Sequence, residues 1–241
     1  MATVLEVRGL TKRFGGLMAV KDLSFSVDEG RVLGIVGPNG SGKTTTFNLI
    51  TGFIKPDSGR VVFDGRDITH LKPYQIVDGG IARTFQIVRV FRGLSVYENV
   101  RAAALLRTSR GDALEDRITQ VLTVVGLAGK EGQRAGSLPI GDLKRLEISR
   151  ALATNPRLVM LDEPFSGLSH AEVSEISGLL RNLINRGLTV VIVEHVLREL
   201  RRLAEQVIVL DFGVKIAEGK FDQVIELPVV REAYLGGATG A

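Results

Sequence analysis

The chain has 241 residues, of which 44% are hydrophobic and 24% charged, and its formal net charge is +4. These values are ordinary for a globular protein and exclude intrinsic disorder for most of the chain. The absence of cysteine excludes disulfides and cysteine-based metal sites, and the 5% aromatic content without tryptophan argues against a base-stacking nucleic-acid surface, so we expect no nucleic-acid partner.

The order of the predicted elements favours an α/β fold. Strands are expected at Val4–Val7, Leu23–Val27, Val32–Val36, Arg60–Phe63, Leu158–Leu161, Thr189–Val193, Gln206–Leu210 and Val214–Ala217. Helices are expected at Gly42–Thr51, Val96–Leu106, Leu114–Val125, Leu143–Thr154, His170–Arg186 and Val196–Leu203. Early strands lie close together, a mostly helical middle follows, and strands then alternate with helices.

This order predicts one domain over residues 1–235, with a helical insertion at about residues 87–155 and a flexible tail at residues 236–241. Two late strands are continuous apolar runs, as in a parallel sheet that is covered on both faces. The N-terminus lacks the pattern of a secretory signal, and no apolar run approaches the roughly 18–20 residues of a membrane helix.

The segment between Gly37 and Thr44 fits the phosphate-loop pattern G-x-x-x-x-G-K-[ST]. It follows an apolar strand and leads into a helix, as phosphate binding requires. Glycines let backbone N–H groups turn toward the phosphates, Lys43 supplies a positive charge, and the Thr44 hydroxyl is a ligand for Mg²⁺. The candidate ATP-binding residues here are Gly37, Asn39, Gly40, Ser41, Gly42, Lys43, Thr44 and Thr45.

Two carboxylates end the buried strand at residues 158–161. Strand alternation is expected to send Asp162 and Glu163 in different directions, so that one serves the metal and the other faces the γ-phosphate. We assign Asp162 to Mg²⁺ and Glu163 as the general base that activates the attacking water. These residues predict a site that binds nucleotide phosphates with Mg²⁺; a P-loop kinase or a small GTPase would also explain Lys43 and Asp162.

With these motifs in order, nearly the whole chain resembles the ATP-binding-cassette (ABC) transporter ATPases. The resemblance implies a P-loop core with a mixed or parallel sheet, an antiparallel β subdomain and a helical insertion subdomain. It implies that Phe14 stacks on adenine, that Gln86 contacts Mg²⁺ and the γ-phosphate region, and that His195 touches the γ-phosphate. Gln86 and His195 thus join Glu163 as candidate catalytic residues, and Gln86 joins Thr44 and Asp162 as a candidate Mg²⁺ ligand.

The signature segment departs most from the family. Where the family has L-S-G-G-Q, this chain has Leu138-Pro139-Ile140-Gly141-Asp142. Pro139 offers neither a hydroxyl nor an N–H, and Asp142 adds negative charge near an anion. What survives is the helix N-terminus at Gly141, a candidate contact for ATP held by a second subunit. Ser169 stands where the family usually has an acid or asparagine.

Several stretches, including Arg83-Thr84-Phe85-Gln86, most resemble the ATPases of branched-chain amino acid importers, a group that also serves related small polar solutes. Alternatives are a lipopolysaccharide-type exporter ATPase and a low-turnover regulatory subunit. The resemblance implies membrane-spanning partners, a second ATPase subunit in a homo- or heterodimer, and indirectly a solute-binding protein. It implies a peripheral place on the cytoplasmic face of the inner or plasma membrane.

An apolar run follows Gln86 and comprises Ile87, Val88, Val90, Phe91, Leu94 and Tyr97. One interpretation is a groove that receives a helix of a membrane subunit. The other is that most of these side chains belong to the core of the helical insertion.

Overall fold

Two sheets organise the protein, whose computed structural model describes residues 2–108 and 111–236. The strands are β1 (Thr3–Phe14), β2 (Leu17–Asp28), β3 (Val32–Val36), β4 (Ser58–Phe63), β5 (Arg66–Asp67), β6 (Ile81–Arg83), β7 (Leu158–Asp162), β8 (Thr189–Val193), β9 (Gln206–Asp211) and β10 (Val214–Lys220). One sheet has the order β2-β1-β4-β5 and the other β10-β9-β3-β8-β7-β6. The first is antiparallel, whereas the second is parallel except for the β9–β10 pair.

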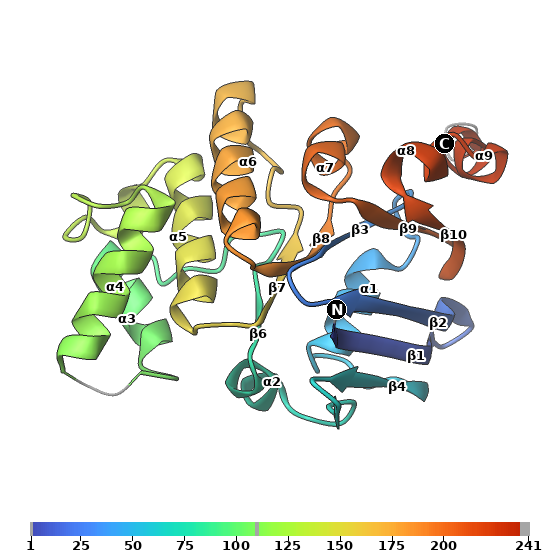
Figure 1. The fold of residues 1–241 in the computed structure, drawn as a ribbon, viewed down its shortest axis with the longest axis horizontal. Helices are drawn as coiled ribbons and strands as arrows, with labels where there is room; N and C mark the ends of the chain where they lie inside the picture. Colours follow the sequence, from blue (N-terminus) through green and yellow to red (C-terminus); the bar gives the residue numbers. More distant parts are fainter. Residues whose placement is uncertain (1, 109–110, 237–241) are drawn as a thin grey trace.

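In the described ranges, seven helices lie in the connections between these strands, and two follow the last strand. They are α1 (Lys43–Ile50), α2 (Pro73–Gly79), α3 (Val96–Ala104), α4 (Asp112–Val125), α5 (Ile140–Ala153), α6 (His170–Asn185), α7 (Leu197–Leu203), α8 (Phe221–Val224) and α9 (Pro228–Gly236), with a 3₁₀ turn at Ala135–Ser137. Figure 1 shows α3, α4 and α5 grouped at one end of the molecule and the antiparallel sheet at the other. None of the helices in the described ranges is long and apolar enough to cross a bilayer.

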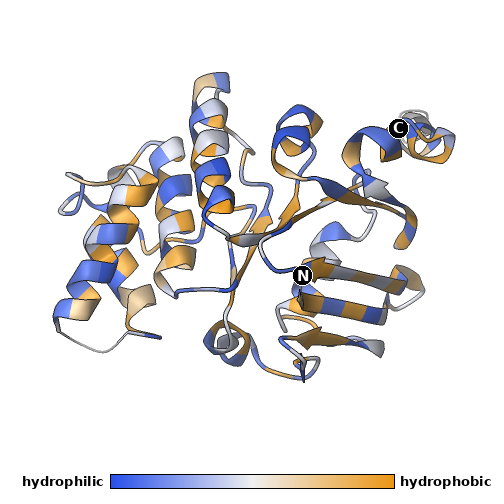
Figure 2. Ribbon diagram, in the orientation of Figure 1, coloured by the Kyte–Doolittle hydropathy of each residue, from blue (hydrophilic) through white to orange (hydrophobic). Residues whose placement is uncertain are grey.

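The parallel sheet is buried on both faces because the interiors of its central strands β3, β7 and β8 carry no polar side chain. In β8, Val190 and Ile192 pack into one hydrophobic cluster, whereas Val191 and Val193 pack into another. The first cluster contains the apolar faces of α4, α5 and α6, and the second contains α1 and the antiparallel sheet. Figure 2 shows the matching pattern, since these helices turn orange stripes inward and blue stripes outward.

The expected fold class is confirmed, including the mixed sheet and the antiparallel sheet. The two N-terminal strands were expected too short. Each has 12 residues, and register shifts between them break the simple alternation of apolar and polar positions. The short helix α2 was not expected, although Pro73 and the hydrogen bond between the Lys72 N–H and the Gln75 side chain mark its start.

The C-terminal end also differs from expectation. Residues 221–236 form helices α8 and α9, and Gly236, expected in a flexible tail, closes α9. The rest of that expected tail, residues 237–241, lies outside the described residues. Within the segment expected as a helical insertion, α3, α4 and α5 pack against one another. The division into a core and an insertion subdomain stays a prediction.

Candidate functional site

The phosphate loop is the turn between β3 and α1. Gly37, Gly40 and Gly42 all have φ between 81° and 149°, where a side chain would be strained. A Cβ on Gly37 would lie 2.1 Å from the Leu210 carbonyl oxygen, and one on Gly42 would lie 2.5 Å from the Ala19 carbonyl oxygen. The glycines are therefore required for the loop to close against β9 and β2, with its backbone N–H groups at the start of α1.

Lys43 is the first residue of α1, and its ammonium group lies inside the loop. Its Nζ donates to the carbonyl oxygens of Gly37 and Pro38, each at 2.8 Å, and to Ser41 Oγ at 3.4 Å. Burial lowers the pKa of Lys43, and the nearby carboxylates of Glu163 and Asp162 oppose this shift. Thr44 in the same turn is exposed, so its hydroxyl is accessible.

Asp162 ends β7 and is almost completely buried, with 2% of its surface exposed. Its Oδ2 accepts a hydrogen bond from Arg83 Nη2 at 2.8 Å, whereas its buried Oδ1 has no hydrogen-bond partner among the described residues. A carboxylate oxygen without a partner is what a hard cation or its water shell requires. The donor set of Thr44 and Asp162 therefore fits Mg²⁺.

Glu163, Gln86 and His195 come together at this end of the sheet. Glu163 Oε2 accepts a hydrogen bond from Gln86 Nε2 at 2.8 Å, and His195 Nδ1 lies 3.5 Å from Glu163 Oε1. The three candidate catalytic residues thus meet although they come from separate segments: Gln86 follows β6, Glu163 follows β7 and His195 follows β8. The arrangement can orient a water molecule beside a carboxylate.

Strand alternation was expected to send Asp162 and Glu163 in different directions. This reason is wrong, because Glu163 does not belong to the strand. Strand β7 ends at Asp162, and Glu163 has a φ of 49°, a left-handed conformation that is uncommon outside glycine. Its N–H still donates to the Val193 carbonyl oxygen of the neighbouring strand at 2.9 Å. The backbone therefore turns sharply at Glu163, which remains 9% exposed, with its carboxylate held against Gln86.

Three buried charged residues that the sequence analysis did not single out support this cluster. Glu147 on α5 accepts hydrogen bonds from the backbone N–H groups of Phe85 and Arg89, on either side of Gln86, at 3.2 and 3.1 Å. Burial raises the pKa of Glu147. Lys144 donates to the carbonyl oxygens of Gln86 and Glu163 at 3.2 and 3.3 Å. Together they fix both loops to α5.

Glu194 is the third of these residues, and it supports the loop after Glu163. Its Oε1 accepts the Phe165 N–H at 2.9 Å, and its Oε2 accepts the N–H groups of His195 and Val196 at 3.0 and 3.1 Å. Burial raises the pKa of Glu194. A carboxyl immediately before His195 was visible in the sequence, but only the fold shows that it binds backbone from two loops.

A buried asparagine shapes the segment that follows Gln86. Asn99 is fully buried on α3, and its amide bonds the N–H and carbonyl of Phe91, at 2.8 and 2.9 Å, and the Ser95 carbonyl at 2.9 Å. We expect Asn99→Ala to lower the free energy of unfolding by about 2–3 kcal/mol, since it leaves buried backbone groups unpaired. Urea titration measures this. The exposed control Glu98→Ala should cost about 1 kcal/mol, and equal losses would contradict the assignment.

The segment that matches the signature opens α5, and an internal carboxylate lies against it. A Cβ on Gly141 would lie 2.7 Å from Oε1 of Glu172 on α6. The other oxygen, Oε2, accepts hydrogen bonds from the hydroxyl and backbone N–H of Ser169 at 2.7 and 2.9 Å, and these bonds lower the pKa of Glu172. Asp142 is ion-paired with Lys130, so its charge is partly offset.

The remaining candidate residues occupy different places. Phe14 ends β1, pairs in the hairpin with Leu17 and is 45% exposed, which leaves its ring accessible for stacking. Lys12 Nζ lies 5.6 Å from the ring centre. Thr45 is half-buried on α1, and Asn39 is exposed in the loop. Helix α9 reaches the loop as well, since its Glu232 helps to line a cavity of about 390 Å³ beside Asn39.

The apolar run after Gln86 divides between surface and core. Ile87, Phe91 and Leu94 are exposed, whereas Val88, Val90 and Tyr97 pack against the helical core. The core interpretation is therefore confirmed for the second group, whereas a groove that receives a partner helix stays a prediction for the exposed group.

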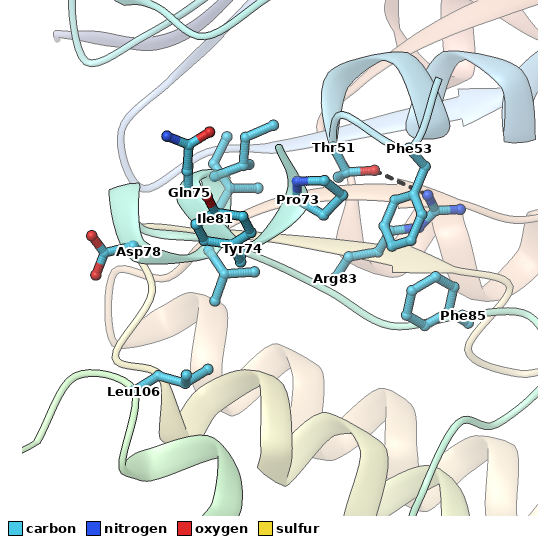
Figure 3. Close-up of a pocket in the computed structure, with 12 residues that line it drawn as sticks. Thr51, Phe53, Pro73, Tyr74, Gln75, Asp78, Ile81, Arg83, Phe85 and Leu106 are labelled. Atoms are coloured by element: carbon cyan, nitrogen blue, oxygen red, sulfur yellow. Dashed lines mark hydrogen bonds between the residues drawn. The ribbon is translucent and has the colours of Figure 1, made fainter. Parts of the chain in front are cut away.

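A more enclosed apolar pocket of about 490 Å³ lies next to Phe85. Figure 3 shows Phe53, Tyr74 and Leu106, from three separate segments, around this pocket. We call it the α2 pocket, because α2 contributes residues 73–78 to its lining. The sequence analysis missed it because α2 itself was not expected.

Comparison with known proteins places these features in one family. The family described as ABC transporter matches residues 20–166. The high-affinity branched-chain amino acid transport ATP-binding protein BraF of Pseudomonas aeruginosa is 36% identical to this chain, and the match covers 98% of each. LivG of Escherichia coli, which carries the same description, is also 36% identical, with 98% of each covered.

Solved structures agree with this match. An ATP-binding cassette of an ABC transporter in its ADP conformation has a TM-score of 0.90 and 33% identity, with 98% of this chain and 100% of that chain covered. A dimeric cassette in a post-hydrolysis state, bound to ADP and phosphate, has a TM-score of 0.80 and 28% identity, with 90% and 98% covered.

Proposed function

The chain belongs to the ABC transporter family, and from this premise we propose that it is the ATP-hydrolysing subunit of an importer for branched-chain amino acids or related small polar solutes. The observation that carries the proposal is the meeting of Gln86, Glu163 and His195 beside the buried Lys43. Full-length identity of 36% to two branched-chain amino acid transport ATP-binding proteins supports the choice of solute. Neither a lipopolysaccharide-type exporter nor a regulatory subunit is favoured by these relatives.

The proposed site binds ATP through the phosphate loop and Phe14. The backbone N–H groups of residues 37–42 and the Lys43 ammonium receive the phosphates, and Thr44, Asp162 and Gln86 hold Mg²⁺. When bound, Mg²⁺ offsets negative charge on the β- and γ-phosphates. The exposed Phe14 ring stacks on adenine.

Glu163 is the general base in this proposal. Its carboxylate orients the attacking water and takes a proton from it. His195, 3.5 Å from Glu163 Oε1, holds the geometry around the γ-phosphate. Gln86 donates its amide to Glu163 Oε2 at 2.8 Å, so a displacement of Gln86 would leave that carboxylate oxygen for the water. Movement of the loop that carries Gln86 therefore controls whether the Glu163 carboxylate is free to act as the base.

A second ATPase subunit completes each site. Two cassettes close head to tail, so that the phosphate loop of one chain faces the signature segment of the other. In this chain the Glu172 carboxylate lies against Gly141. We therefore expect asymmetry: the site that uses Lys43 of this chain with an intact partner signature hydrolyses ATP faster than the site that uses Gly141.

Neutralising Glu172 tests this part of the proposal. Glu172→Gln keeps a hydrogen-bond acceptor for α6 but removes the negative charge that a γ-phosphate would meet at Gly141. We expect ATP-driven association of the cassettes to tighten about threefold, the size of a charge effect at a helix N-terminus. Analytical ultracentrifugation with ATP measures it in a Glu163→Gln background. The control Glu175→Gln removes a charge from the same helix, and an equal gain there would count against the idea.

Membrane subunits dock at the α2 pocket and the exposed residues after Gln86. Phe53, Tyr74 and Leu106 are exposed apolar side chains around one concave surface, a pattern that suits an apolar helix of a partner. The peripheral location on the cytoplasmic face follows from this docking.

Purification through a tag on this chain tests the function as a whole. The complex is extracted from native membranes and reconstituted into liposomes with ATP inside. We expect ATP-dependent uptake of leucine or valine, in the presence of the co-purified binding protein, and a second cassette in the complex. Uptake of neither amino acid, with transport of an unrelated solute, would contradict the proposed cargo.

A further inference from the structure

Arg83 at the end of β6 is a buried cation for which the proposed reaction gives no role. Its side chain is only 6% exposed, and its Nη2 donates to Asp162 Oδ2 at 2.8 Å. Figure 3 shows it beside the α2 pocket, between Thr51 and the aromatic rings of Phe53 and Phe85. A buried guanidinium is costly unless it is paired, so each of its contacts constrains its position.

The second guanidinium nitrogen ties Arg83 to the helix that begins at Lys43. Its Nη1 donates to Asn48 Oδ1 at 2.7 Å and to Thr51 Oγ1 at 3.1 Å. One planar group thus joins the C-terminal part of α1 and its cap to the acidic end of β7. Because Arg83 presents its donors in a rigid fork, it fixes the carboxylate plane of Asp162 relative to α1.

Aromatic rings enclose the same guanidinium on the pocket side. Its central carbon lies 4.9 Å from the ring centre of Phe85 and 5.8 Å from that of Phe53. Both rings line the α2 pocket, as does Arg83 itself. A side chain that enters the pocket therefore contacts the residues that hold Arg83, and Arg83 contacts the proposed metal ligand.

We propose that Arg83 is a positioning residue that aims Asp162 Oδ1 at the metal and links the α2 pocket to the metal site. The inference rests on the proposed ATPase function. Arg83 holds Oδ2, which leaves the buried, unpartnered Oδ1 as the oxygen that faces Mg²⁺ or its water.

The binding of a fluorescent non-hydrolysable ATP analogue to the full chain tests the proposal. Its dissociation constant is measured in EDTA and in Mg²⁺, and the ratio of the two constants reports how far Mg²⁺ strengthens binding. For Arg83→Met we expect this ratio to fall about 10-fold, the usual effect of losing a partner of a metal ligand. The constant in EDTA should stay within about twofold, because the phosphate loop is unchanged.

Three variants separate this role from others. Arg89→Met removes a cation that stacks on the same Phe85 ring, at 4.5 Å, without a bond to Asp162, and should leave the ratio unchanged. Thr51→Val removes a contact of Arg83 on the pocket side and should lower the ratio about twofold. Arg83→Lys keeps the charge but not the fork, so it should restore only part of the ratio. If Arg83→Met does not fold, the ratio measured for Arg83→Lys tests the proposal instead.

The positioning role is overturned if a folded Arg83 variant keeps the wild-type ratio of the two dissociation constants while Mg²⁺ no longer strengthens binding in Asp162→Asn. A wild-type ratio in Thr51→Val overturns the link to the pocket. A wild-type chain that binds no ATP analogue contradicts the proposed function itself, and this inference with it. The two failures are therefore distinguishable.

Discussion

Replacing Glu163 by glutamine is expected to lower ATP hydrolysis by about 10²–10⁴-fold, the usual contribution of a general base. Glutamine is nearly the same size and can still accept a hydrogen bond from Gln86, which bonds Glu163 Oε2 at 2.8 Å. It cannot take a proton from water. The variant should therefore bind ATP as the wild type does and accumulate as an ATP-bound dimer.

Phosphate release by the reconstituted transporter measures the rate, and size-exclusion chromatography with ATP detects the trapped dimer. The control is Glu175→Gln on the exposed face of α6, which should retain the wild-type rate within about twofold. A Glu163→Gln variant that hydrolyses ATP at the wild-type rate would falsify the assignment of the base. Loss of ATP binding would instead make Glu163 a binding residue.

Replacing Lys43 by methionine is expected to weaken ATP binding by at least about 100-fold and to remove hydrolysis. A unit charge about 4 Å from a phosphate oxygen contributes on the order of 4 kcal/mol at an effective dielectric constant of 20, and part of this is offset by desolvation. Lys43 is 7% exposed and held by the carbonyl oxygens of Gly37 and Pro38, so its ammonium is already placed before ATP arrives. Methionine fills the same space without the charge.

Isothermal titration with ATP and Mg²⁺ measures the affinity. Because Lys43→Met also leaves the Gly37 and Pro38 carbonyl oxygens without their donor, thermal unfolding must show that the fold is retained. Lys55→Met removes an exposed lysine whose Nζ donates to the Leu71 carbonyl oxygen, and this variant should bind ATP with the wild-type affinity. Equal affinities for the Lys43 and Lys55 variants would contradict the proposed role of the loop.

The sequence predicts the phosphate loop well because its chemistry is local. The glycines and Lys43 lie within one short segment, and the turn they form brings them together without help from distant residues. The strands β7 and β8 were equally visible, since a strand buried on both faces must be apolar throughout. The role of His195, in contrast, came from the family resemblance, and the parallel pairing of β7 with β8 shows why it lies near Glu163.

The features that the sequence analysis did not predict depend on long-range contacts or on weak local patterns. Arg83 and Asp162 are 79 residues apart, and nothing in either segment names the other as its partner. Likewise, Glu172 is read from sequence as the start of α6, whereas its contact with Gly141 arises from the packing of two helices. Helix α2 has only seven residues, too few for a helical period to show.

The rate of ATP hydrolysis by the purified chain, measured over a range of protein concentrations beside Glu163→Gln, tests the central claim most directly. A site shared between two cassettes predicts a rate per chain that rises with concentration and disappears in the variant. It also predicts a slow rate, because the negatively charged Glu172 carboxylate lies against Gly141 in each chain. A rate per chain that is independent of concentration, or unchanged in Glu163→Gln, would contradict the account.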